Sequence, residues 1–279
     1  MRKIDLQLVS DSVRNLFIDA CENIPENVLN ALKKAAETEQ SPLGKQVITK
    51  IVENAYLGRE KHLPICQDTG VAVVYLTIGS EVYFEGDIYE AVNEGVRRAY
   101  GEGYLRKSVV RHPLDRVNTK DNTPAIVHIK MVPGDVFKID VAPKGGGSEN
   151  MSLVKMLIPA DGIEGIKKLV VDTVFHAGGK PCPPLVVGVG IGGNFEKCAL
   201  LAKEALFREI DDESADPIAN QLEKDLLKLI NDTGVGPMGF GGTTTCLAVK
   251  VNVHPCHIAS LPVAINIQCH AARHKSITL

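Results

Sequence analysis

The sequence predicts an α/β protein in which mixed sheets are flanked by helices and a helical lobe forms the N-terminal part. Two observations lead to this class. Apolar residues recur at helical spacing over about residues 1–60, and apolar runs rich in β-branched residues then alternate with further helical patterns. A chain of 279 residues without an internal linker can form one large domain, so a single domain over 1–279 is expected.

The N-terminal part carries the helical periodicity. Leu6, Val9 and Val13 recur every three to four residues, which is the pattern of one helix face. Pro25 and Pro42 stand near the starts of the second and third helical patterns, where proline is tolerated. The predicted helices of this lobe cover 5–22, 25–39 and 42–58.

The rest of the chain alternates between strands and helices. The run V-A-V-V-Y-L-T-I at 71–78 is rich in β-branched residues and predicts a strand. Two short strands flank Pro133-Gly134 and predict a β-hairpin. Strands are expected at 71–78, 125–131, 135–142, 185–191, 243–253 and 262–268, and helices at 87–100, 162–177, 194–209 and 217–231.

Composition excludes several functional classes. The net charge of −3 gives no basic surface for nucleic acid or an anionic membrane, and the absence of Trp is unfavourable for base stacking. No apolar run reaches the roughly 18 residues that a membrane span needs. Asp5 and Asp11 interrupt the apolar positions of the N-terminus, which argues against a secretion signal and favours the cytoplasm.

Four of the seven cysteines are expected to be structural. Cys21 and Cys198 lie inside helical patterns and are predicted to be small core residues. Cys246 lies in a strand pattern and Cys256 in a His-Pro loop, and both are interpreted in the same way. A cytoplasmic chain of this size needs no disulfides, so metal binding or catalysis is considered for the other three.

Those three cysteines stand in loops with unusual neighbours: Cys66 in P-I-C-Q-D-T-G, Cys182 in K-P-C-P-P and Cys269 in I-Q-C-H-A-A-R-H. Iron–sulfur clusters usually take four thiolates; three could hold one that leaves one iron open for substrate, as a catalytic zinc keeps an open position. A catalytic Cys66–His dyad is the alternative for this cysteine, although the local signatures of cysteine proteases are missing.

Two glycine-rich stretches resemble phosphate-binding loops without matching them fully. G188-V-G-I-G-G193 fits G-x-G-x-x-G, but no βαβ unit follows it, so a tight turn between a strand and a helix is favoured over dinucleotide binding. K144-G-G-G-S148 lacks the ending of a P-loop. It is either a plain turn or a cradle of backbone N–H groups for a carboxylate or phosphate.

Histidines and cysteines crowd the last 26 residues, which raises a zinc-stabilised binding module as a distant alternative. No finger-type pair has a matching partner pair in this segment, which speaks against it.

Five ordered stretches carry a resemblance that covers the chain from about residue 10 to its C-terminus. They are I-C-Q-D-T-G (65–70), A-P-K-G-G-G-S-E-N (142–150), C-P-P-L-V-V-G-V-G-I-G-G (182–193), G-P-M-G-F-G-G-T-T-T (236–245) and H-I-A-S-L-P-V-A-I-N (257–266). Together they resemble the iron–sulfur (class I) fumarate hydratases and L-tartrate dehydratases, and specifically the α subunit of the two-subunit form.

The resemblance implies an oxygen-sensitive [4Fe-4S] cluster with one open iron, held by Cys66, Cys182 and Cys269. It further implies a separate β subunit and a hetero-oligomer such as α2β2, because the fused enzymes carry a second, swivelling module with basic residues and a candidate catalytic base. The implied substrate contacts are Gln67, Asp68, Arg106, Gly145, Gly146, Gly147 and His257.

The expected reaction is the reversible dehydration of a four-carbon 2-hydroxy dicarboxylate, (S)-malate to fumarate, with L-tartrate to oxaloacetate as the alternative. Hydroxide is a poor leaving group and needs a Lewis acid or a proton, while the developing aci-carboxylate charge needs preorganised donors. Arg106 and the N–H groups of 145–147 are the expected donors, with Lys144 a weaker candidate. Asp68 is assigned to proton transfer and His257 to orienting Asp68 or binding a carboxylate; an Asx-turn role for Asp68 and a structural role for His257 stay open.

Overall fold

The structure, a computed structural model, describes all residues from Met1 to Leu279. The chain divides into two compact units. The first unit comprises Met1–Pro25, Asn54–Gly146 and Arg273–Leu279, and the second comprises Glu26–Glu53 and Gly147–Ala272. Segments that are far apart in the sequence therefore build each unit.

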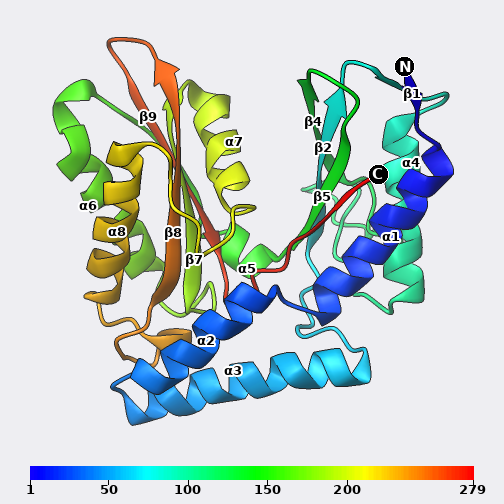
Figure 1. Cartoon of the computed structure of the whole chain (residues 1–279). Coiled ribbons are helices and arrows are strands. Elements are labelled where there is room, and N and C mark those ends of the chain that lie inside the picture. Colours follow the sequence, from blue (N-terminus) through cyan, green and yellow to red (C-terminus); the bar gives the residue numbers. More distant parts are fainter. The chain divides into compact units, whose positions relative to one another are not determined.

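The first unit is a four-stranded sheet with two helices packed on one of its faces (Figure 1). The strand order is β10-β5-β2-β4, in which β2 and β4 are parallel while β5 is antiparallel to both β2 and β10. The elements are β1 (Arg2–Lys3), α1 (Leu6–Glu22), β2 (Val71–Gly79), β3 (Val82–Tyr83), α4 (Ile88–Glu102), β4 (Ile126–Val132), β5 (Phe137–Lys144) and β10 (Lys275–Thr278).

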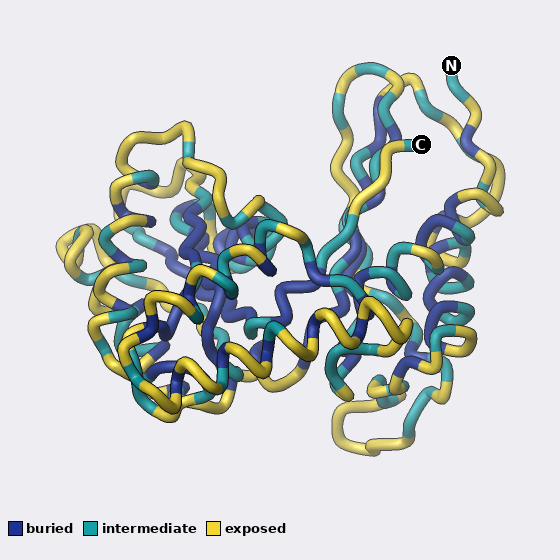
Figure 2. The backbone as a smooth tube through the Cα atoms, turned by 60° about the horizontal axis from the view of Figure 1, so that its bottom comes forward, coloured by how far each residue is buried: buried dark blue, intermediate teal, exposed yellow.

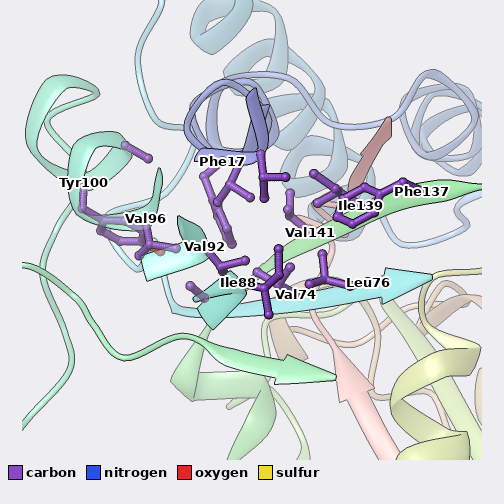
Figure 3. Packing of buried hydrophobic residues seen from close by; sticks show 14 of the residues in the cluster. Phe17, Val74, Leu76, Ile88, Val92, Val96, Tyr100, Phe137, Ile139 and Val141 are labelled. Atoms are coloured by element: carbon purple, nitrogen blue, oxygen red, sulfur yellow. The ribbon is translucent and has the colours of Figure 1, made fainter. Parts of the chain in front are cut away.

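The core of the first unit lies between this sheet and its two helices, as Figure 3 shows. Phe17 of α1 and Tyr100 of α4 are fully buried, with ring centroids 6.3 Å apart. Both helices begin at an aspartate cap, Asp5 for α1 and Asp87 for α4, whose carboxylates accept backbone N–H bonds of the first turn. Every second residue of β2 faces the helices, and these core residues are Ala72, Val74, Leu76 and Ile78.

The predicted hairpin around Pro133-Gly134 is wrong. Strands β4 and β5 do not pair with each other, because β2 lies between them and pairs with both. The turn residues bond instead to the end of β2, where Gly79 N donates to Val136 O at 2.7 Å and Ser80 N donates to Val132 O at 2.8 Å. Local turn chemistry identified the reversal of the chain correctly but could not reveal the strand inserted between its arms.

The second unit is a four-stranded sheet covered on both faces. Its strand order is β6-β9-β7-β8, with β7 and β8 parallel and β9 antiparallel to β7 and β6. Helices α6 and α8 cover one face and α7 the other (Figure 1), and the strands in between are buried (Figure 2). The elements are α2 (Glu26–Thr38), β6 (Leu153–Leu157), α6 (Gly162–Ala177), β7 (Leu185–Gly193), α7 (Phe195–Ala205), α8 (Pro217–Asn231), β8 (Cys246–Cys256) and β9 (Leu261–Gln268).

The glycines of the 188–193 stretch allow α7 to pack closely on β7. A Cβ at Gly188 would stand 2.2 Å from Ala202 O, and one at Gly190 would stand 2.1 Å from Cys198 O. Asn194 then caps α7 by accepting the Lys197 N–H. Both glycines lie within the strand, so close contact between helix and strand explains them without a nucleotide.

The N-terminal region is helical as expected, and its helices are distributed over both units. Helix α1 packs on the sheet of the first unit, whereas α2 belongs to the second unit, where it contacts β8. Helix α3 (Pro42–Lys61) contributes residues to both units. Nowhere does the structure contain a helix with both the length and the apolar character needed to cross a membrane.

Candidate functional site

The stretch from Cys66 to Gly70 leads into β2 and holds a carboxylate in a fixed position. Asp68 accepts the Gly70 N–H on Oδ1 at 3.0 Å and the Gly146 N–H on Oδ2 at 2.8 Å. The Asp68 N–H in turn donates to Cys66 Sγ at 3.4 Å. A thiol and a carboxylate are thereby fixed side by side, and the Asx turn that we considered for Asp68 is present.

The glycine stretch after β5 is the cradle for that carboxylate. Gly70 has a φ of 76°, and a Cβ there would stand 2.6 Å from Lys144 C, so only glycine lets the two segments meet. Lys144 and Gly145 are buried, while Gly146 is exposed. The N–H group of Gly146, predicted to contact substrate, is occupied by Asp68 in this structure.

Arg273 joins these two segments from the C-terminal end of the chain. Its side chain is 3% exposed and its Nη2 donates to Asp68 O at 2.8 Å and to Pro143 O at 3.3 Å. The buried guanidinium of Arg273 thus connects the backbone carbonyl of Asp68 with that of Pro143, two residues before Gly145.

Arg106 lies on the long loop that follows α4 and is exposed. Its backbone is tied to the Cys66–Gly70 stretch, because Thr69 Oγ1 donates to Arg106 O at 2.9 Å. Tyr100, which is buried in the core of the first unit, also bonds to this stretch, since its hydroxyl donates to Thr69 O at 2.6 Å. The structure therefore brings Asp68, Gly146 and the Arg106 loop together within the first unit, while Gln67 is exposed at its surface.

The loops of Cys182 and Cys269 meet at one end of the strands in the sheet of the second unit. Cys182 precedes β7 and Cys269 follows β9, and the antiparallel register pairs Val186 with Gln268. His270 holds the two loops together: its N–H donates to Cys182 O at 3.3 Å, and its ring Nδ1 lies 3.1 Å from the same oxygen. Cys182 has a φ of 57°, an unusual backbone conformation for a residue other than glycine.

The Cys182 loop is supported by the glycine-rich loop at 236–245. Met238 N donates to Pro183 O at 2.9 Å, and Leu185 N donates to Thr245 O at 2.9 Å. Gly179 and Gly239 are in close contact, since a Cβ on Gly239 would lie 2.6 Å from the Gly179 Cα.

A buried carboxylate anchors that supporting loop. Glu39, between α2 and α3, accepts N–H bonds from Ser41 and Thr243 at 2.8 Å each and from Thr244 at 2.8 Å. Burial alone would raise the pKa of Glu39, but these hydrogen bonds outweigh it and lower the pKa to about 2. The N-terminal helices thus contribute an ionised anchor near the loop that holds Cys182.

His257 lies at the opposite end of the strands of the same sheet. It follows β8, whose last residue Cys256 pairs with Gly193 at the far end of β7 from Cys182. The nine residues of β7 separate the two ends by roughly 25 Å at about 3.3 Å per residue. His257 is exposed and accepts the Ala259 N–H on Nδ1 at 3.1 Å, so this chain does not bring it near Cys182 or Cys269. Gly147 is exposed as well.

The cysteines sort by burial into the groups expected from their sequence contexts, with one exception. Cys21, Cys198 and Cys246 are buried, and desolvation raises the pKa of Cys21 to about 11 and that of Cys246 to about 12. Cys66, Cys182 and Cys269 are partly exposed. The exception is Cys256, which is exposed at the end of β8 and is no core residue.

These three thiols suit the donor chemistry of an iron–sulfur cluster. They are soft ligands, partly exposed, and held on loops that adjoin strands, and the Cys182 and Cys269 loops are joined through His270. The structure gathers no group of three or more His, Cys, Asp or Glu side chains that could hold a metal ion. Cys66 belongs to the first unit, and Cys182 and Cys269 belong to the second.

Sequence reasoning missed the polar residues that hold the candidate site in place: Glu39, Tyr100, Asn122 and Arg273. All four are buried in the structure. Their sequence context gave little signal, because each reaches a partner that is more than 30 residues away along the chain.

Comparison with known proteins identifies the family. The family model described as fumarate hydratase (Fumerase) matches residues 10–278. A protein of Methanocaldococcus jannaschii named putative L(+)-tartrate dehydratase subunit alpha is 46% identical over 272 residues, which cover 95% of each chain. The L(+)-tartrate dehydratase subunit alpha of Escherichia coli strain K12 is 29% identical over 273 residues, which cover 96% of this chain and 90% of that protein. With the candidate site built from the motifs of that family, the chain belongs to the fumarate hydratases, a family of hydro-lyases.

Proposed function

We propose that this chain is the α subunit of an iron–sulfur hydro-lyase that reversibly converts (S)-malate to fumarate in the cytoplasm. The observation that carries the proposal is the Cys66–Gly70 stretch, where a partly exposed thiol stands beside a carboxylate with both oxygens hydrogen-bonded.

Cys66, Cys182 and Cys269 would hold a [4Fe-4S] cluster. When bound, such a cluster supplies a Lewis-acidic iron for the departure of a hydroxyl group. The pairing of the Cys182 and Cys269 loops through His270 supports these two as ligands from one unit.

Substrate binding would fall to polar groups around Asp68. Arg106 is exposed on a loop whose backbone is bonded to Thr69, so its guanidinium is available for a carboxylate of the dicarboxylic acid. Gln67, exposed beside Cys66, would hydrogen-bond the substrate hydroxyl. Lys144 and the N–H groups of Gly145 and Gly147 would contribute positive potential near the developing charge, whereas the Gly146 N–H is bonded to Asp68 and would hold that carboxylate in place.

Asp68 would transfer a proton to the leaving hydroxyl. Its two oxygens are held by Gly70 and Gly146, which fixes the direction of the carboxylate and limits its reorganisation during the reaction. Removal of the C3 proton needs a base that we assign to a separate β subunit, which fits the subunit names of the relatives.

His257 would reach a substrate only as a contribution from a neighbouring chain. It is exposed at the end of the strands opposite to Cys182 and Cys269. A hetero-oligomer such as α2β2 would supply that neighbour, because closed symmetry places each chain against a copy of itself.

L-tartrate dehydration is the second candidate, favoured by the names of relatives that cover almost the whole chain. The two substrates differ by one hydroxyl group. Anaerobic co-expression with the β subunit, followed by turnover of malate and of tartrate, tests both. Preferential turnover of malate supports the leading proposal, preferential turnover of tartrate supports the second, and full activity of the α chain alone contradicts the need for a partner.

A further inference from the structure

Asn122 is a buried side chain that ties the Arg106 loop to the Cys66–Gly70 stretch. The residue has no exposed surface, and its side chain makes hydrogen bonds in two directions. Oδ1 accepts the Ser108 N–H at 2.7 Å and the Val109 N–H at 3.2 Å. Nδ2 donates to Gly70 O at 3.1 Å.

These contacts hold both ends of a segment that has no helix or strand of its own. The chain between α4 and β4 contains only an isolated bridge between Val110 and Asn118, so side chains must fix its path. The acceptor Oδ1 binds the chain two and three residues after Arg106. The donor Nδ2 binds the chain two residues after Asp68.

The Arg106 side is fixed a second time by the bond from Thr69 Oγ1 to Arg106 O. Arg106 therefore lies on a short segment bounded by two ties, and both ties lead to the Thr69-Gly70 dipeptide. Asn122 itself has a φ of 63°, a conformation that asparagine tolerates better than most residues. Losing the Asn122 side chain would leave the part-buried Ser108 and Val109 N–H groups without this acceptor, while Gly70 O would keep its bond from the Tyr100 hydroxyl at 3.2 Å.

We infer that Asn122 is a positioning residue for Arg106, which sets the distance between the guanidinium and the carboxylate of Asp68 in the hydro-lyase. This inference rests on the proposed role of Arg106 in substrate binding. A residue that merely stabilised the loop would change the stability of the protein, whereas a positioning residue changes KM through Arg106 and not independently of it.

The test is a double-mutant cycle on the anaerobically assembled αβ enzyme. We measure kcat and KM for malate in Asn122→Ala, Arg106→Gln and the double variant. Asn122→Asp is the second variant: it keeps the acceptor for the Ser108 and Val109 N–H groups and removes the donor to Gly70 O. Its KM for malate tests the positioning role even if the alanine variant does not fold. Asn118→Ala is the matched control, since Asn118 ties the same loop by donating to Lys107 O at 2.9 Å without touching Gly70.

We expect Asn122→Ala to raise KM by about tenfold, with a smaller loss in kcat and unchanged iron content. In the Arg106→Gln background the same change should raise KM by less than about twofold. A full tenfold increase in that background, or an effect of Asn118→Ala equal to that of Asn122→Ala, overturns the positioning role. A normal KM in Arg106→Gln instead refutes the proposed substrate contact of Arg106, and the positioning role falls with it.

Discussion

The buried carboxylate of Glu39 allows a quantitative prediction about the loop that supports Cys182. Glu39 is 5% exposed, and its oxygens accept N–H bonds from Ser41, Thr243 and Thr244. We consider Glu39→Gln, which keeps the size of the side chain but places an amide NH2 against backbone donors.

The magnitude follows from proton linkage. The pKa of Glu39 falls from 4.5 to about 2 on folding, and each unit of difference corresponds to about 1.4 kcal/mol. Ionised Glu39 therefore stabilises the folded state by about 3 kcal/mol at neutral pH. A lowered folded pKa means that this stabilisation is complete above the unfolded value and is lost as the pH falls through the folded value. It should drop to less than half at about pH 3 and nearly vanish at about pH 2.

The assay is urea unfolding of the wild-type chain and of Glu39→Gln from pH 7 to pH 3, followed by circular dichroism. We expect the variant to be about 3 kcal/mol less stable at pH 7, with a gap that narrows steadily below about pH 5. Glu37→Gln is the control, because Glu37 is exposed near the end of α2, two residues before Glu39, and should change stability by less than about 0.5 kcal/mol at any pH. A gap that does not depend on pH would refute the reasoning, since it would attribute the loss to packing instead of charge.

Two further predictions concern the backbone of the candidate site and the place of His257. Gly70→Ala should destabilise the first unit by about 3 kcal/mol, because the added Cβ would stand 2.6 to 2.7 Å from backbone atoms of Lys144. Gly134→Ala is the control: its φ is similar but nothing lies within 4 Å of an added Cβ, so it should cost about 1 kcal/mol. Equal losses of stability in urea unfolding would contradict the steric argument. A Cys182→Ser chain and a His257→Ala chain should each be inactive when it is the only α chain assembled with the β subunit. Co-expression of the two variants should restore activity, because one site of the mixed assembly then has both an intact Cys182 and an intact His257 from the neighbouring chain. Continued inactivity of the mixed assembly would rule out a contribution of His257 from a neighbouring chain.

Most elements of the fold could be predicted from the sequence, because their signals are local. The predicted helices at 5–22 and 217–231 agree with α1 and α8 to within one residue, since each carries a complete apolar face. Strands β6 and β10 were missed because they are short edge strands with mostly exposed residues. The order of the strands could not be predicted either, since it depends on which segments meet after the chain has folded.

In the candidate site, too, local sequence signals identified some residues, whereas residues that act through distant contacts were missed. Its polar and reactive groups were recognisable, because Cys66 and Asp68 stand in loops with no apolar period to explain them. Their supporting residues were not recognisable, because Arg273 reaches Asp68 across 205 positions of sequence and Asn122 reaches Gly70 across 52. The residue that the fold places unexpectedly is His257, since sequence distance from Cys269 gave no hint that a strand would separate them.

The central claim is that Cys66, Cys182 and Cys269 hold an iron–sulfur cluster needed for malate dehydration. The most direct measurement is the iron and sulfide content, visible absorbance and malate turnover of the anaerobically prepared αβ enzyme in Cys66→Ser, with Cys256→Ser as the matched control. We predict that Cys66→Ser loses cluster absorbance and turnover together, while Cys256→Ser retains both. Full turnover with an intact cluster in Cys66→Ser, or loss of the cluster in Cys256→Ser, would contradict the assignment.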